Sequence, residues 1–117
     1  MAVKFVDLKD TYNIKTKTKD IVVDVKIGDG QSGNYSISLG KNLIEINAPA
    51  TMGKQADVEG KKTIVSVKVN DTLTETNHTS MTVTVTEGAT ATTYGPYSQE
   101  VDMHLDSVIY TLKLMNQ

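Results

Sequence analysis

Apolar and polar side chains alternate with a period of two along most of this chain, and that alternation restricts what it can fold into. In residues 79–86 Met81, Val83 and Val85 alternate with threonines, and residues 20–27 repeat the pattern with isoleucine and valine. Successive side chains of a β-strand point to opposite faces of a sheet, so the pattern predicts half-buried strands. No window of helical length carries apolar residues at spacings of three and four. We therefore expect an all-β protein.

About eight strands are expected, separated by turns rich in glycine, asparagine and aspartate. They lie near residues 3–6, 20–27, 34–39, 42–46, 62–69, 79–86, 98–105 and 107–115. Each has one apolar face, which a second sheet must cover. The prediction is a single-domain antiparallel β-sandwich over residues 1–117, and both immunoglobulin-like and jelly-roll connectivity fit the pattern. A chain of 117 residues is long enough to form one hydrophobic core without stabilising disulfides or metal ions.

Cysteine and arginine are both missing from the chain, and their absence removes several kinds of site. Without cysteine there is no disulfide, no thiolate nucleophile and no cysteine-ligated metal. All 12 basic residues are lysines, so the bidentate guanidinium contacts typical of nucleic-acid recognition are not available. The net charge of −2 and the pI of 5.6 point the same way. We expect no nucleic-acid partner.

The chain carries no apolar run long enough to cross a bilayer, and its first ten residues lack the apolar stretch of a signal peptide. We expect no membrane insertion. The location is expected to be cytoplasmic, or that of a mature exported domain without its signal. The lack of cysteine fits both, since many exported bacterial β-domains also do without it.

The segment TTYGPYSQ, residues 92–99, is the predicted contact surface. Gly95 and Pro96 predict a turn, and Tyr94 and Tyr97 flank it, so that two amphipathic rings would be displayed together at a loop tip. Tyrosine offers a large contact area at a low entropic cost. In the alternative interpretation, one of the rings anchors a corner of the sandwich.

A row of lysines lies in the segment KTKTKD, residues 15–20. Lys15, Lys17 and Lys19 would share one face of an extended chain. We favour an edge strand whose charges discourage pairing with another sheet. The alternative is a contact with an anionic surface.

Residues 101–106 place Asp102, His104 and Asp106 on one face of an expected strand. Carboxylates around a histidine could bind a metal, together with His78, but such a row is also typical of a solvated strand face, which we favour. No nucleophile elbow or cofactor motif is present. We expect no catalytic residue, no metal and no cofactor.

Two further segments are expected to be irregular. The glycines of residues 28–33 suit a hairpin that needs positive φ angles. The longer segment, residues 47–62, is either a binding element or a crossover from one sheet to the other, and Met52 and Val58 could hold it to the core.

These features favour a non-enzymatic β-sandwich that binds a protein or another ligand through its loops. The second hypothesis is a structural subunit that self-associates through exposed strands or through the threonine face of residues 82–86. The third is a glycan-binding or hydrolytic domain, which would require Glu100, Asp102 and Asp106 to converge in a cleft.

Overall fold

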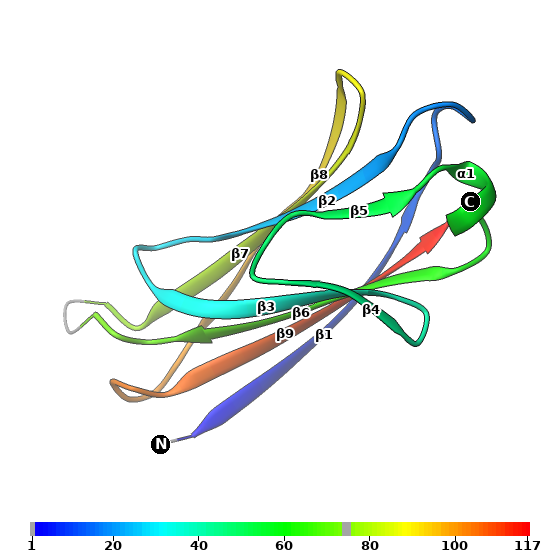
Figure 1. Cartoon of the computed structure of the whole chain (residues 1–117). Coiled ribbons are helices and arrows are strands. Elements are labelled where there is room, and N and C mark those ends of the chain that lie inside the picture. Colours follow the sequence, from blue (N-terminus) through cyan, green and yellow to red (C-terminus); the bar gives the residue numbers. More distant parts are fainter. Residues whose placement is uncertain (1, 74–75) are drawn as a thin grey trace.

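The computed structural model describes residues 2–73 and 76–117, which form two packed β-sheets (Figure 1). The five-stranded sheet has the order β1-β9-β6-β3-β4 and consists of β1 (Val3–Tyr12), β3 (Ser32–Leu39), β4 (Asn42–Ile46), β6 (Lys62–Asn70) and β9 (Ser107–Asn116). The four-stranded sheet has the order β5-β2-β7-β8 and consists of β2 (Ile21–Ile27), β5 (Ala50–Gly53), β7 (His78–Glu87) and β8 (Thr90–Glu100). A short helix, α1 (Gln55–Val58), follows β5. The predicted all-β sandwich is confirmed.

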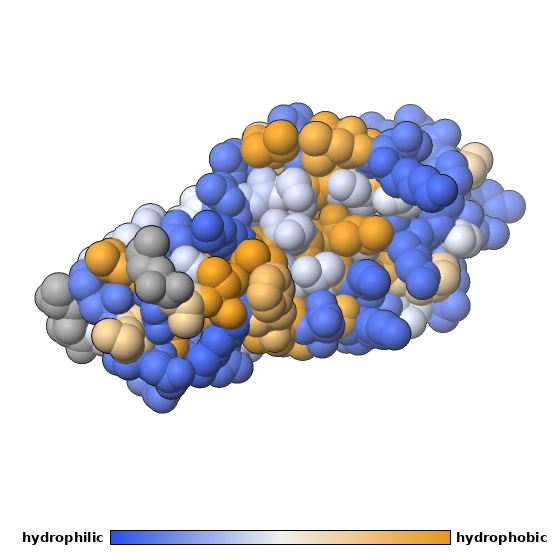
Figure 2. All heavy atoms as spheres, turned by 90° about the horizontal axis from the view of Figure 1, so that it is seen from below, coloured by the Kyte–Doolittle hydropathy of each residue, from blue (hydrophilic) through white to orange (hydrophobic). Residues whose placement is uncertain are grey.

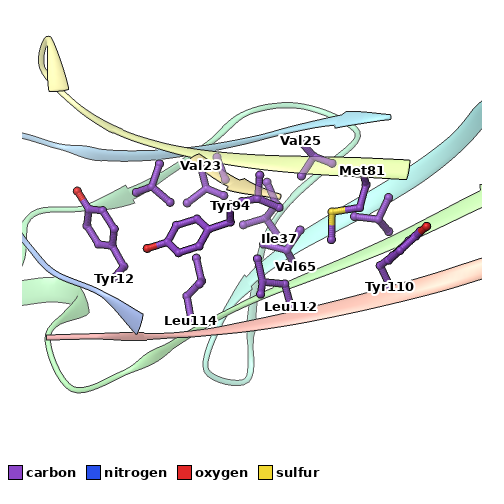
Figure 3. Packing of buried hydrophobic residues seen from close by; sticks show 14 of the residues in the cluster. Tyr12, Val23, Val25, Ile37, Val65, Met81, Tyr94, Tyr110, Leu112 and Leu114 are labelled. Atoms are coloured by element: carbon purple, nitrogen blue, oxygen red, sulfur yellow. The ribbon is translucent and has the colours of Figure 1, made fainter. Parts of the chain in front are cut away.

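The hydrophobic core lies between the two sheets and is built from the inward residues of the alternating strands. Val23 and Val25 of the four-stranded sheet face Ile37, Val65 and Leu112 of the other sheet (Figure 3). All five side chains are buried. The threonines of residues 82–86 occupy the other face of β7 and are half-buried at its surface. The period-two pattern therefore assigns the faces of these strands correctly.

β1 is longer than expected and pairs in an unexpected direction. The predicted N-terminal strand near residues 3–6 continues to Tyr12 and runs parallel to β9. The other strand pairs among the described residues are antiparallel. In this edge strand Val3 and Phe5 are exposed, and the second half carries the exposed residues Asp7, Lys9 and Asp10, so its apolar alternation is weak.

The expected strand near residues 98–105 is confirmed only for residues 98–100, which belong to β8, and is wrong for residues 101–105. β8 ends at Glu100, and the chain then turns toward β9, which leaves Met103 69% exposed and Leu105 49% exposed. Asp106 is buried instead, and its carboxylate accepts hydrogen bonds from the N–H groups of Ala2 (2.8 Å) and Met103 (3.1 Å). A buried carboxylate that holds a turn thus outweighs a short apolar alternation.

The segment 47–62 crosses between the sheets, as expected, because β4 and β5 belong to different sheets. Met52 and Val58 are both buried and hold it to the core. The segment is not irregular throughout, since it contains β5 and α1. These elements are only four residues long, which is too short for a periodic pattern to reveal them.

The glycine-rich connection after β2 is not a hairpin, because β2 and β3 lie in different sheets. Gly30 has a positive φ of 70°, as expected. Gly33 has a different role: a Cβ atom there would lie 2.0 Å from the carbonyl oxygen of Lys68 on β6. This glycine permits close backbone approach between two paired strands.

The chain order of the strands differs from that of a constant-type immunoglobulin domain. In that sandwich the last two strands follow each other within one sheet. Here the last two strands, β8 and β9, lie in different sheets.

Within the described residues, no helix is long and apolar enough to span a membrane.

Candidate functional site

The tyrosines of the predicted contact segment lie within β8 and not at a loop tip. Tyr94 is opposite Val83 of β7, is 8% exposed and points into the core (Figure 3). Its hydroxyl donates to the carbonyl of Thr11 at 2.7 Å. Burial, and then the negative charge of Asp10, raise the pKa of Tyr94 to about 12. Tyr94 is therefore an anchor of the core.

Tyr97 is half-buried opposite Met81 and packs against the core. Gly95 and Pro96 lie where the register between β7 and β8 shifts, so they belong to an irregularity of the strand and not to a turn. The expected display of both rings at a loop tip is wrong, because threonine and tyrosine pair well across strands and extend β8 through this segment. A contact role for Tyr97 stays a prediction.

The lysine segment, residues 15–20, has no strand structure and forms the connection between β1 and β2 at one end of the sandwich. The interpretation as a protected edge strand is wrong. Lys15, Lys17 and Lys19 are all exposed. The alternative interpretation, in which these lysines contact an anionic surface, stays a prediction.

A buried carboxylate holds this connection in place. Glu87, at the end of β7, is 2% exposed, and its carboxylate accepts hydrogen bonds from the N–H groups of Lys15 (2.9 Å) and Thr16 (3.2 Å). The hydroxyl of Tyr12 also donates to it. Burial and the neighbouring carboxylate raise the pKa of Tyr12, so this phenol keeps its proton and remains a donor. The three donors compensate the cost of burying the carboxylate.

The rest of the connection is held by contacts with its neighbours. The side chain of Lys19 lies across Gly88, where an added Cβ atom would approach its Cδ to 2.6 Å. Asp20 forms an ion pair with Lys54 at 3.2 Å, just before α1. The carboxylate of Asp57 in turn accepts a hydrogen bond from the N–H of Lys54 at 2.9 Å. The lysine segment and α1 are thus held side by side.

A shallow hollow of about 430 Å³ lies between this connection and α1. Its lining consists of Lys17, Gln55, Ala56 and Glu59, that is, a cation, an amide, a small apolar side chain and a carboxylate. The Gln55 amide already donates to the carboxylate of Glu59, so the hollow has a lining of mixed charge that sets the cation of Lys17 beside an anion.

Most lysines of the protein gather at the same end, which we call the lysine-rich end and define as residues 9–20, 40–41, 54–62, 87–90 and 113–117. Nine of the 12 lysines belong to it: Lys9, Lys15, Lys17, Lys19, Lys41, Lys54, Lys61, Lys62 and Lys113. Its carboxylates are Asp10, Asp20, Asp57, Glu59 and Glu87. These nine cations and five anions give a formal charge of +4, whereas the whole chain carries −2. The charge of the molecule is therefore strongly uneven.

Some of these lysines are placed against each other. Lys9 of β1 and Lys113 of β9 are directly paired in the parallel register. Together with Lys62, Asp10 and Met115 they line a second hollow, of about 100 Å³, on the side of the five-stranded sheet. Like charges in directly paired positions are destabilising. A bound anion would relieve this repulsion.

The carboxylates and histidines near the opposite end do not meet in a cleft. Glu100 pairs with His78 at 3.2 Å and Asp102 pairs with Lys4 at 3.5 Å. Asp106 is buried and bound to backbone groups, while His104 is exposed in the turn after β8. Across residues 2–73 and 76–117, no group of three or more metal-ligating side chains is found. The convergence required by the hydrolytic hypothesis is not found there either.

Glu87 was missed at the sequence level, although a signal for it exists. It continues the inward positions Met81, Val83 and Val85 of β7. A charged residue at an inward position of a strand must find partners, so this break in the alternation indicates a built polar contact. Comparisons of the chain with protein-family models, with curated protein sequences and with solved structures found no match in any of the three.

Proposed function

We propose that this protein is a non-enzymatic binding module whose lysine-rich end contacts an acidic surface of a protein partner. The observation that carries the proposal is the formal charge of +4 at one end, where three of the nine lysines lie on a connection that Glu87 holds in place. A binding segment that is already ordered loses little conformational entropy when a partner binds. Clustered charge also steers the encounter between the two proteins.

A protein partner suits these side chains better than a nucleic acid does. Lysine is a point charge that pairs readily with carboxylates, whereas bidentate recognition of bases and phosphates relies on the arginine fork, and this chain has no arginine.

Placing the binding surface on connections at one end of the sandwich is also the arrangement of immunoglobulin variable domains. The likeness that we propose concerns the position of the binding surface at one end of the sandwich and does not include the order of the strands.

The test uses poly-L-glutamate as a model acidic partner in isothermal titration calorimetry. Wild-type protein should bind it, and log affinity should fall with log salt concentration. The double variant Lys17→Glu with Lys19→Glu should bind about tenfold more weakly. The matched control is Lys26→Glu with Lys68→Glu, which makes the same change of charge at exposed positions outside the lysine-rich end.

Equal weakening by the two double variants would mean that only net charge matters, and would refute the assigned site. A short DNA duplex serves as the second probe. If the duplex bound much more tightly than poly-L-glutamate at matched charge concentration, the assignment of a protein partner would be wrong.

A further inference from the structure

Three lysines from three neighbouring strands lie on the outer face of the five-stranded sheet, within the lysine-rich end. Lys9 of β1 is directly paired with Lys113 of β9. Lys62 of β6 is opposite Met115, which follows Lys113 by two residues and so shares its face of the sheet. All three lysines are exposed. The register of the sheet thus collects three cations that are far apart in the sequence.

The three side chains line the same hollow, of about 100 Å³, together with Met115 and Asp10. A water molecule takes up roughly 30 Å³ in the liquid, so the hollow has room for a small ion with a few oxygen atoms. Figure 2 shows the outer face of this sheet, where hydrophilic side chains cover most of the lysine-rich end, on the right of the view. The hollow is therefore open to a small charged solute.

No carboxylate forms an ion pair with these lysines in the part of the chain that the structure describes, where the ion pairs found involve other cations. Asp10 lines the hollow, but alternation along β1 directs its side chain to the face opposite that of Lys9. Its carboxylate accepts a hydrogen bond from the N–H of Thr11 at 2.8 Å. Asp7 shares the face of Lys9 but does not line the hollow. An anion from outside is therefore needed to balance the three charges.

We infer that Lys9, Lys62 and Lys113 bind a terminal phosphate group, that of inorganic phosphate or of a phosphate monoester. A phosphate monoester carries a charge of about −1.5 to −2 at neutral pH and has three strong acceptor oxygens. Three ammonium groups match it both in charge and in the number of donors. A carboxylate has one charge and two oxygens, so it would leave one lysine unpaired. A phosphodiester of a nucleic acid also carries only one charge.

The site lies on the sheet, in a different hollow from the one that Lys17 lines, so it does not depend on the proposed function. Lys9 and Lys113 repel each other in paired positions, and a bound phosphate relieves that repulsion. Only the folded chain brings the three lysines together, so phosphate should bind the folded state and stabilise it.

The test is a titration of the ¹⁵N-labelled protein with inorganic phosphate at neutral pH and constant ionic strength, followed by the amide chemical shifts. The shifts near Lys9, Lys62 and Lys113 should saturate. Lys113→Gln should raise the dissociation constant about tenfold, because one hydrogen bond between charged groups is lost. The control, Lys17→Gln, removes the same charge at a residue of the other hollow and should leave the dissociation constant unchanged. The amide spectrum of each variant also shows that it is folded.

Two further probes define the ligand. Acetate should bind at least about tenfold more weakly than phosphate, because it carries a single charge. A phosphoserine peptide, with its unphosphorylated form as the control, distinguishes the two sources of phosphate. Tighter binding of this peptide than of inorganic phosphate would assign the site to phosphorylated side chains, and the reverse to the free ion. Both results support a site for a terminal phosphate.

The inference would be overturned by the absence of a saturable shift near the three lysines, or by acetate that binds as tightly as phosphate. Equal dissociation constants in Lys113→Gln and Lys17→Gln would overturn it as well. Poly-L-glutamate binding by Lys17 and Lys19 is measured separately, so a failure of this site and a failure of the proposed function are distinguishable.

Discussion

Individual polar residues fix the turns and connections of this sandwich through hydrogen bonds to the backbone. Glu87, Asp106 and Asp57 are carboxylates that accept hydrogen bonds from backbone N–H groups of turns. Tyr94 does the converse, because it donates to a backbone carbonyl of β1 from within the core. Hydrogen bonds of this kind have a modest net value, but losing one partner leaves the other buried and unsatisfied.

Replacing Glu87 with Gln should destabilise the protein by about 1–3 kcal/mol, because the amide NH₂ group would then face donors and leave a backbone N–H without an acceptor. Urea unfolding measures the change. Glu59→Gln, at an exposed position of the lysine-rich end, is the control and should change stability by less than about 0.5 kcal/mol. An unchanged free energy of unfolding in Glu87→Gln would show that this carboxylate does not hold the connection.

Tyr94 predicts how stability depends on pH. Its pKa is raised from the ordinary value of 10.0 to about 12 in the folded protein, chiefly because the ring is buried. The unfolded chain therefore loses this proton first, so the contribution of Tyr94 is complete below pH 10 and is lost as the pH rises toward 12.

The Tyr94→Phe variant should be less stable by about 1 kcal/mol at neutral pH, because the carbonyl of Thr11 loses its donor. Its stability should also fall less steeply in alkali than that of the wild type. Thermal melting in a pH series compares the two proteins. If the melting temperatures of the two proteins fell equally above pH 10, Tyr94 would not be a main cause of the loss of stability in alkali.

At the scale of elements, the pairing of neighbouring strands sets requirements that a single strand does not reveal. β3 approaches β6 so closely at Gly33 that no side chain fits there. The turn glycine Gly40, in contrast, has a positive φ of 59° and open space around it. The two glycines are needed for different reasons, namely steric approach and backbone conformation.

Gly33→Ala should therefore cost more stability than Gly40→Ala. We expect about 2–3 kcal/mol for the first, since a methyl group must push β3 away from β6. For the second we expect about 1 kcal/mol, since only the left-handed backbone is penalised. Guanidinium unfolding of both variants gives the comparison. A larger loss in Gly40→Ala would mean that close strand approach is not limiting.

At the scale of the whole molecule, charge is separated along the long direction of the sandwich. The strands bring lysines from distant parts of the sequence to one end, where they repel each other. A cost of this kind is typical of binding surfaces, where stability is reduced in favour of function.

Lys113→Glu tests whether the lysine-rich end reduces stability. It converts the like-charge pair with Lys9 into an opposite-charge pair, so stability should rise by about 0.5–1 kcal/mol at low salt. Affinity for poly-L-glutamate should fall in the same variant. Lys26→Glu, opposite Thr82 on the other sheet, is the control for both measurements. Lower stability in Lys113→Glu would contradict the proposed repulsion.

The sequence by itself determined the class of fold, the residues on each side of most strands and the kinds of chemistry that are missing. Val65, Val67 and Val69 point inward and the threonines of β7 outward, because the side-chain period of a strand is two wherever it lies. The same local rule explains the errors. An apolar period can be found in five residues of a turn, as in residues 101–105. It is weak in an edge strand such as β1, whose second half carries exposed charged residues.

Only the tertiary structure decided which residues meet. It placed Tyr94 in the core, set β1 parallel to β9, left β4 at a free edge and collected nine lysines at one end. The physical reason is that alternation specifies the side to which a residue points, but not which strand lies next to it. Neighbours are chosen by contacts between distant segments, such as Glu87 with residues 12–16, and these form only when both sheets have packed.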